Sequence, residues 1–169
     1  MLDYGVALRR IKEGIARKEF DLEIDLTRPW GGYITLERNQ ICTPKILFVT
    51  DDLSIQSHEL RDEVWVLLLG RAAAYRGPIR DTPQETVAGL EETIMDPGDI
   101  IYIPRRTVHA VTNAGGPAVI AELASGEAQE ADIVRYYDKH MRGDKPVVLQ
   151  GYEAGISIKN LIERCRERR

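Results

Sequence analysis

The sequence predicts a single all-β domain, a barrel or sandwich, with a helix at each end. Three observations indicate this fold: short β-rich runs separated by turn residues fill the middle of the chain, and helical periodicity marks both the first and the last segment. The 169 residues are enough for one domain with its own core. A hydrophobic content of 43% and a charged content of 30% are typical of a soluble globular protein.

The first segment, residues 3–17, is predicted to form an amphipathic helix. Val6, Ile11 and Ile15 fall on one side of this helix, and most of the charged residues fall on the other. Between residues 21 and 123 the chain changes to short β-rich runs broken by turn residues. The expected strands in this region are 32–36, 45–50, 63–69, 99–103 and 118–122.

The later segments are predicted from composition and periodicity. Residues 76–92 are rich in Pro, Gly, Thr and acidic residues, so we expect a long hairpin or loop there. Residues 131–142 have an irregular to helical pattern, and 155–168 are predicted to form a closing amphipathic helix. We therefore expect one structural domain made of a helical extension (1–25), a β-barrel (26–142) and a helical tail (143–169).

Charge and cysteine content narrow the expected partners and location. The net charge of −4 gives no indication of nucleic-acid binding, and no apolar run reaches the roughly 20 residues of a membrane-spanning helix. The N-terminus lacks the pattern of a signal peptide. Cys42 and Cys165 are too few for a disulfide framework and are expected to be reduced thiols. We expect a cytoplasmic protein with neither nucleic-acid nor membrane partners.

Four potential metal ligands fall on the predicted strands. Gln56 and His58 are two residues apart, so on a strand they project from the same face. Glu63 opens the next strand, and His109 lies on a later one. An amide oxygen, two imidazoles and a carboxylate suit zinc, manganese, iron, cobalt or nickel, whereas calcium or magnesium prefers more oxygen ligands. We expect one divalent metal ion here, with zinc as the first choice; the alternative is four unrelated polar residues in ordinary strands.

Several motifs together resemble a known family. They are Arg28-Pro-Trp-Gly31, Gln56-Ser-His58, Arg61-Asp-Glu63-Val-Trp65, Gly98 followed by Pro104 and His109, and Asp132-Ile-Val-Arg135. Their spacing is similar to the paired signature motifs of the cupin superfamily, and most closely resembles the cupin domain of type II mannose-6-phosphate isomerases. This resemblance implies a double-stranded β-helix, or jelly-roll barrel, and it covers residues 27–142. It also implies a Gln, His, Glu, His ligand set, which type I phosphomannose isomerases use.

The chain departs from the family pattern at a few positions. Thr50 stands where the first motif begins with Gly, and Arg106 replaces the Gly of a Pro-x-Gly turn that favours positive φ. Leu60 and Ala124 stand where the type II pattern often has His and Gln. Because these last two lie near the expected pocket, they bear on the choice of substrate more than on metal binding.

The resemblance implies an isomerase, which needs a base and cations for a phosphate. Glu122 ends an otherwise apolar strand, so its pKa should be raised and it is the candidate base; the alternative is a carboxylate paired with an arginine at the rim. Lys45 and Arg61 are the first candidates for contacts with substrate in the catalytic site. The further substrate-binding candidates are Arg106, Arg135, Trp65 and, as a second stacking ring, Trp30. For each cation the alternative is an ordinary surface charge, and for the tryptophans it is core packing.

The leading hypothesis is a metal-dependent aldose–ketose isomerase that converts mannose 6-phosphate to fructose 6-phosphate. The alternatives are another metal-dependent cupin enzyme, such as a different sugar isomerase or a dioxygenase, and a sugar-binding cupin without catalysis. We also expect a homodimer, since the N-terminal helix has more apolar surface than the barrel needs. The resemblance implies the same, because cupins commonly pair through sheet edges, where exposed edge strands favour cover.

Overall fold

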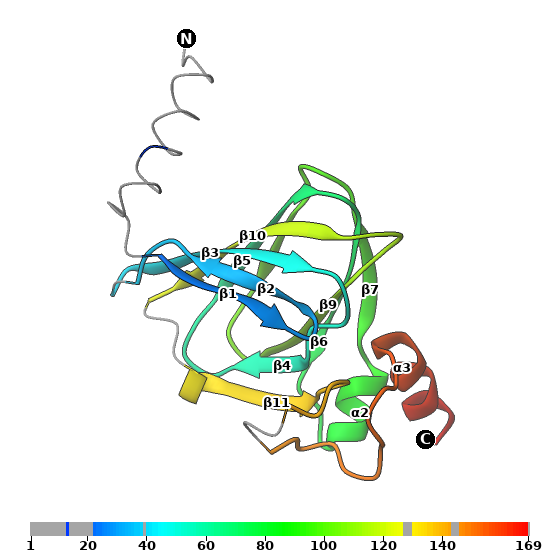
Figure 1. The fold of residues 1–169 in the computed structure, drawn as a ribbon. Coiled ribbons are helices and arrows are strands. Elements are labelled where there is room, and N and C mark those ends of the chain that lie inside the picture. Colours follow the sequence, from blue (N-terminus) through cyan, green and yellow to red (C-terminus); the bar gives the residue numbers. More distant parts are fainter. Residues whose placement is uncertain (1–12, 14–21, 39, 127–129, 143–145, 169) are drawn as a thin grey trace.

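The computed structural model describes residues 13, 22–38, 40–126, 130–142 and 146–168, which form two antiparallel β-sheets (Figure 1). The six-stranded sheet contains, in spatial order, β1 (Glu23–Arg28), β2 (Gly31–Thr35), β3 (Cys42–Val49), β10 (Ala118–Ser125), β5 (Glu63–Leu69) and β8 (Ile100–Ile103). The five-stranded sheet contains β11 (Ile133–Tyr137), β4 (Ile55–His58), β9 (Thr107–Asn113), β6 (Ala72–Pro78) and β7 (Glu91–Met95). The predicted all-β architecture is confirmed.

The main core lies between the two sheets. Buried side chains from both inner faces meet there, including Trp65, Leu67, Ile120, Val111 and Met95. This follows from the alternation of side chains along each strand, since residues two apart share a face. In β5 every second residue from position 63 to 67 is buried and those between are half-exposed. The same alternation directs the candidate ligands toward the interior.

A second core lies on the outer side of the five-stranded sheet. Two helices, α2 (Pro83–Ala88) and α3 (Ile158–Glu167), pack there beside the C-terminus (Figure 1). Leu161 and Cys165 of α3 are fully buried in this cluster together with Ile55 and Val108 of the sheet. The predicted closing helix is confirmed as α3, and it starts after Ser157, whose side chain accepts a hydrogen bond from the amide of Asn160.

Residues 76–92, predicted as a long hairpin or loop, connect the antiparallel strands β6 and β7, and the connection contains a helix that was not predicted. Strand β6 runs on to Pro78, helix α2 follows, and β7 begins at Glu91. Thr82 and Glu85 form a capping box at the start of α2, with Pro83 in its first turn. These are strong helix-start signals, and the Pro-rich and acidic composition of the segment hid them.

The irregular to helical pattern predicted for residues 131–142 is wrong in part. A short 3-10 turn, η1 (Glu130–Asp132), leads directly into strand β11. β11 pairs with β4, so that Arg135 lies opposite Gln56 and Ile133 lies opposite His58. This partner comes from a segment about 75 residues earlier in the chain, which no local pattern reveals. The strand therefore borders the candidate site.

Some predictions concern parts of the chain that the structure does not test. The helix expected over residues 3–17 falls outside the described residues except at Glu13, and the domain boundaries at 25 and 142 stay predictions. Among the described helices, none has the length and apolar character needed to cross a membrane. Cys42 and Cys165 are not linked by a disulfide.

Candidate metal centre

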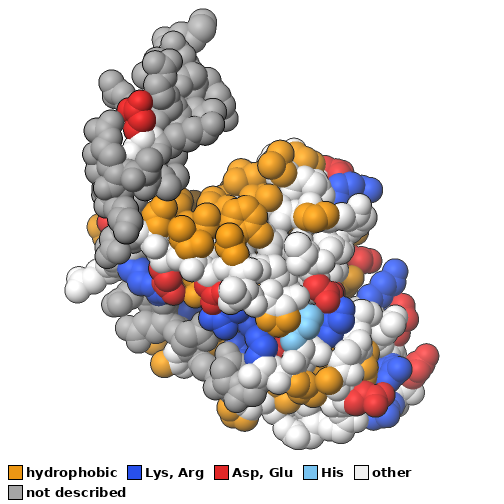
Figure 2. Space-filling model, viewed as in Figure 1, with side chains coloured by type: hydrophobic (Ala, Val, Ile, Leu, Met, Phe, Trp, Pro, Cys, Tyr) orange, Lys and Arg blue, Asp and Glu red, His pale blue; other side chains and the backbone are white. Residues whose placement is uncertain are grey.

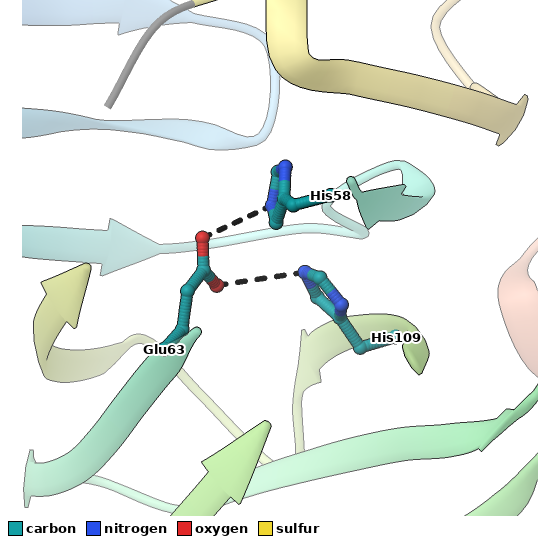
Figure 3. Close-up of side chains that lie close together, drawn as sticks. All are labelled: His58, Glu63 and His109. Carbon is teal, nitrogen blue, oxygen red and sulfur yellow. Dashed lines mark ion pairs between the residues drawn. The ribbon is translucent and has the colours of Figure 1, made fainter. Parts of the chain in front are cut away.

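Three strands from both sheets bring His58, Glu63 and His109 together (Figure 3). His58 is the last residue of β4, and His109 lies on the neighbouring strand β9. Glu63 is the first residue of β5, across the interior in the other sheet. One possible ligand atom from each of the three lies within 4.8 Å of the others. Three of the four metal ligands predicted from the sequence therefore lie close together in the fold.

The three side chains form a buried cluster centred on the carboxylate. The Nε2 atom of His58 lies 3.0 Å from Oε1 of Glu63, and the Nε2 atom of His109 lies 3.5 Å from Oε2. All three side chains are at most 2% exposed. The two imidazole rings have centroids 5.0 Å apart and are tilted by 46°. Two nitrogens and a carboxylate thus point at a common region from three directions.

The surroundings of His109 suit a neutral imidazole ligand. Its Nδ1 lies 3.0 Å from the carbonyl oxygen of Thr107. Because a carbonyl can only accept, Nδ1 carries the proton and Nε2 keeps its lone pair toward Glu63. Burial lowers the pKa of His109 to about 4, against the opposing effect of the Glu63 carboxylate. The fully buried ring of Trp65 packs edge-on against His109 at a centroid distance of 5.4 Å.

Glu63 is kept ionised despite its burial. Burial by itself would raise its pKa, but the hydrogen bond with His58 and the positive charge of Arg61 outweigh this effect. The pKa of Glu63 therefore lies well below its usual range. A carboxylate held in its charged form between two imidazoles is a good ligand for a divalent cation.

The pattern of unsatisfied polar atoms also fits a cation. Oε2 of Glu63 and Nε2 of His109 are buried and make no hydrogen bond with any described residue. Buried polar atoms normally have a partner, since leaving one unpaired costs about 1–3 kcal/mol. Both atoms are electron-pair donors that face one another, so a shared positive ion satisfies them together. The donor set does not select one metal among zinc, manganese, iron, cobalt and nickel.

Gln56, the fourth predicted ligand, lies beside the cluster. It is half-buried, and it pairs with His109 across β4 and β9, so the two residues share a face. Its Oε1 accepts a hydrogen bond of 2.9 Å from Ser54, whose Oγ lies 3.1 Å from Nη2 of Arg142. Arg142 in turn donates to Asp138 at 2.7 Å. This chain of contacts fixes the amide orientation; metal ligation by Gln56 stays a prediction.

A buried ion-pair network supports the ligands from outside. Nε of Arg61 lies 3.1 Å from Oε1 of Glu63, and Nη2 lies 3.2 Å from Nε2 of His58. Nη1 faces Oδ2 of Asp132 at 3.4 Å. Oδ1 of Asp132 also accepts the amide hydrogens of Glu59 and Leu60, at 3.0 and 2.8 Å. Asp132 therefore holds the whole turn between two ligands.

Sequence reasoning missed this role of Asp132. The residue appeared only as part of a family motif, and it lies 71 positions from Arg61. Sequence reasoning took Arg61 as a contact for substrate. The structure places its guanidinium, with a side chain only 6% exposed, against Glu63 and Asp132. A phosphate contact by Arg61 stays a prediction, whereas its contact with the ligand carboxylate is a feature of the fold.

Glu122, which is buried, and Lys45, which is half-buried, form an ion pair on the same inner surface. They are directly opposite each other on β10 and β3, and Nζ of Lys45 lies 3.4 Å from Oε1 of Glu122. The next strand places Trp65 opposite Glu122 and Glu63 opposite Ala124. Burial raises the pKa of Glu122, the negative charge of Glu63 raises it further, and Lys45 opposes both. The alternative interpretation of Glu122 was a carboxylate paired with an arginine at the rim. In the structure its partner is Lys45.

The remaining predicted substrate contacts differ in their exposure. Arg135 is buried on β11 opposite Gln56. The Arg106 side chain is 69% exposed and lies 3.6 Å from Glu59, while its amide donates to the carbonyl of His58. Its φ of 63° shows that the turn adopts the left-handed conformation that the missing glycine would favour. Trp65 and Trp30 are both buried, so core packing accounts for their positions.

A cavity of about 460 Å³ adjoins this network on its outer side. Its lining includes Leu60, Arg61, Ser125, Asp132 and Val134. Leu60 is 77% exposed at this rim, whereas Ala124 is fully buried. Leu60 and Ala124 are the two residues near the pocket that depart from the family pattern. Only Leu60 is exposed enough to contact a molecule that enters from solvent.

Residues 15–138 match the model of a protein family described as mannose-6-phosphate isomerase C-terminal. The chain belongs to this family. The resemblance drawn from the sequence motifs is thereby confirmed. A mannose-1-phosphate guanylyltransferase, ManC, from Salmonella typhimurium is 30% identical over 130 residues, which are 75% of this chain and 25% of that protein. The alginate biosynthesis protein AlgA from Pseudomonas putida is 30% identical over 151 residues, 87% of this chain and 28% of that protein. This member of the family spans about a quarter of the length of these relatives.

Solved structures confirm the cupin fold of this family member. The capsular polysaccharide assembling protein CapF from Staphylococcus aureus matches with a TM-score of 0.56 at 12% identity, over 66% of this chain and 33% of that one. KdgF from Halomonas sp. matches with a TM-score of 0.51 at 15% identity, over 66% of this chain and 92% of that one. At these identities the matches establish the two-sheet architecture alone.

Proposed function

We propose that this chain is a metal-dependent aldose–ketose isomerase of a phosphorylated sugar, and that it converts mannose 6-phosphate to fructose 6-phosphate. One observation carries the proposal: the buried cluster of His58, Glu63 and His109 shares an inner surface with the Glu122–Lys45 pair. Isomerisation needs both a cation and a base, and this surface offers ligands for the first and a candidate for the second. Membership of the mannose-6-phosphate isomerase C-terminal family supports the choice of substrate.

The metal ion and the two carboxylates, Glu63 and Glu122, have different roles in the proposed reaction. When bound by these ligands, a divalent metal ion supplies positive charge that stabilises negative charge developing on the sugar oxygens. Zinc remains the first choice for this ion. Glu63 serves as a metal ligand. Its lowered pKa also makes it a poor proton acceptor near neutral pH. Glu122 has a raised pKa, which is what a base working near neutral pH requires.

In the proposed reaction Glu122 moves one proton between adjacent carbons. Its carboxylate accepts the proton from C2 of the aldose, and the electron pair of that C–H bond forms the double bond of an enediol. Glu122 then returns the proton to C1, while the O2 hydroxyl proton is transferred to O1, so that no oxidant or reductant is consumed. Lys45, 3.4 Å from Glu122, stabilises the ionised carboxylate and donates to a sugar oxygen.

We propose that the phosphate group of the substrate binds to arginines near the strands that contain the metal ligands. Arg106 has a largely exposed guanidinium, and its backbone is hydrogen-bonded to His58, so it is placed near the ligands and open to solvent. Arg135 enters from β11 beside Gln56. We keep Arg106, Arg135, Lys45 and Arg61 as the proposed substrate-binding cations, with Trp65 supporting His109.

The test is proton exchange at C2 of the sugar. The purified chain, loaded with zinc, manganese or cobalt, is incubated with mannose 6-phosphate in D2O and followed by proton NMR. Fructose 6-phosphate, or deuterium at C2, is expected with the wild-type chain. The Glu122→Gln variant should bind the same amount of metal and show no exchange.

Each negative result has a defined meaning. No exchange with any of the three metals would refute mannose 6-phosphate isomerisation by this chain. Exchange at the wild-type rate in Glu122→Gln would remove Glu122 as the base and leave the isomerase intact. Binding of sugar phosphates without exchange would favour a sugar-binding cupin, and turnover that requires Fe(II) and oxygen would favour a dioxygenase.

A further inference from the structure

The outward face of the six-stranded sheet is apolar from one edge to the other. Cross-strand pairing aligns one row across all six strands: Ile24, Ile34, Ile46, Ala121, Val66 and Ile100. A row on one side of it contains Pro44, Leu123, Val64 and Tyr102, and a row on the other side contains Phe48, Val119 and Leu69. We call these three rows the outer apolar face.

Much of the outer apolar face is open to solvent. Ile24, Ile100, Tyr102 and Leu69 are exposed by 55, 67, 54 and 64%. Figure 2 shows hydrophobic side chains gathered over this part of the molecule. An antiparallel sheet with one face in water normally alternates apolar and polar residues, and strands β3, β5, β8 and β10 do not. The sequence of these four strands is therefore that of a sheet covered on both sides.

The other sheet shows what such a pattern means in this protein. Its outward face is also apolar, with Ile55, Tyr75 and Val108, and these residues are buried beneath α2 and α3. Within the described residues no helix or strand covers the outer apolar face in the same way, since Ile100, Tyr102 and Leu69 stay more than half exposed. The two sheets differ in their cover and not in the apolar character of their outward faces.

The size of the outer apolar face suits a protein–protein interface. Strands lie about 4.8 Å apart and same-face residues about 6.7 Å apart along a strand, so the residues of the three rows together span roughly 420 Å². Two such faces packed together bury about 840 Å², the size class of weak and transient protein complexes. Isolated exposed apolar residues need no explanation, whereas a continuous patch of this size marks a contact surface.

The charges around this face favour a second copy of the chain as the partner. None of the residues in the three rows is charged. At the β1 edge the charged residues are already paired within the chain: Arg28 with Asp25 at 2.7 Å, and Arg38 with Glu23 at 2.5 Å. A neutral face is complementary to itself about a two-fold axis, because no like charges meet. We propose that two copies of this chain pack through their outer apolar faces to form the homodimer.

This pairing uses the face of the sheet, in contrast to the edge contact expected from the sequence. It leaves the metal ligands, which lie on the inner side, within each copy. The same face therefore explains why β3, β5, β8 and β10 keep apolar residues on both sides while only one side contributes to the site.

The test is the mass of the full chain in solution, measured by light scattering coupled to gel filtration. The wild-type chain is expected at twice the 19.1 kDa of one copy. Ile100→Glu and Ile24→Glu place a charge at opposite ends of the central row, at exposed positions that the fold tolerates. Both variants should elute as monomers with unchanged circular dichroism. Two variants are used so that a folding failure in one leaves the other informative.

Ile94→Glu is the matched control. Ile94 is a 43% exposed isoleucine on β7 of the other sheet, and this variant should remain dimeric. A monomeric wild-type chain at all concentrations would overturn the proposal and leave residues 1–21 of the same chain, or a different protein, as the cover. A dimer that persists in both Ile100→Glu and Ile24→Glu would equally overturn it, since the contact would then lie elsewhere.

Discussion

Asp132→Asn should weaken metal binding without unfolding the protein. In the wild-type chain the Asp132 carboxylate compensates the charge of Arg61, whose guanidinium contacts both Glu63 and His58. With asparagine the shape is kept and one oxygen still accepts the amides of Glu59 and Leu60. Without the Asp132 carboxylate, Arg61 interacts more strongly with the Glu63 carboxylate, where its positive charge competes with the cation.

The expected size of the effect follows from the geometry. Loss of a partner that orients a metal ligand typically costs 10–100-fold in metal affinity, about 1.4–2.7 kcal/mol. The contact between Arg61 and Asp132 is single and long, at 3.4 Å, so we expect the lower end, about tenfold. Asp132→Ala removes the two amide hydrogen bonds as well, and should lower the free energy of unfolding by about 2–4 kcal/mol.

The assay is a competition titration against a chelating indicator, with cobalt or zinc, alongside thermal unfolding of each metal-free variant. The matched control is Asp96→Asn. Asp96 pairs with Arg71 at a shorter distance, 2.8 Å, but both side chains are more than half exposed. An exposed pair of this kind contributes about 0–1 kcal/mol to stability and should not change metal affinity. Wild-type metal affinity in a folded Asp132→Asn protein would refute the supporting role of Asp132.

Three further predictions concern the ligands, the base and a strained turn. His58→Ala and His109→Ala should each lose stoichiometric metal binding, measured by elemental analysis after desalting; one equivalent retained in both variants would exclude the cluster as the site. If Glu122 is the base, kcat/KM should fall as the pH drops through the raised pKa of Glu122, because the proton acceptor is then neutralised; a pH profile without an acid limb above the ordinary carboxyl range would contradict this. Arg106→Gly should raise the free energy of unfolding by about 0.5–1 kcal/mol, since glycine adopts φ of 63° without the penalty of a side chain. Arg105→Gly, next to it but outside the left-handed region and paired with Asp62, should instead lower stability in the same chemical denaturation experiment.

Strand periodicity was enough to predict much of the fold and the composition of the site. The two-residue spacing of Gln56 and His58 fixed a shared face, and a strand opening at Glu63 placed a carboxylate at the start of an apolar run. The segments that were missed are those that strand periodicity and composition do not mark. β11 is short and takes its partner from β4, and α2 sits in a region whose composition is typical of a loop.

The sequence by itself therefore determined an all-β domain with two imidazoles and a carboxylate on inward-facing positions, because alternation along a strand is a local property. Only the tertiary structure decided which inward faces meet. It paired Arg61 with Asp132 and Lys45 with Glu122, residues separated by about 70 positions or more. In the described part of the chain it also covered one outward apolar face with helices and left much of the other open to solvent. Strand order and register settle these pairings, and both depend on contacts between distant segments that no local pattern encodes.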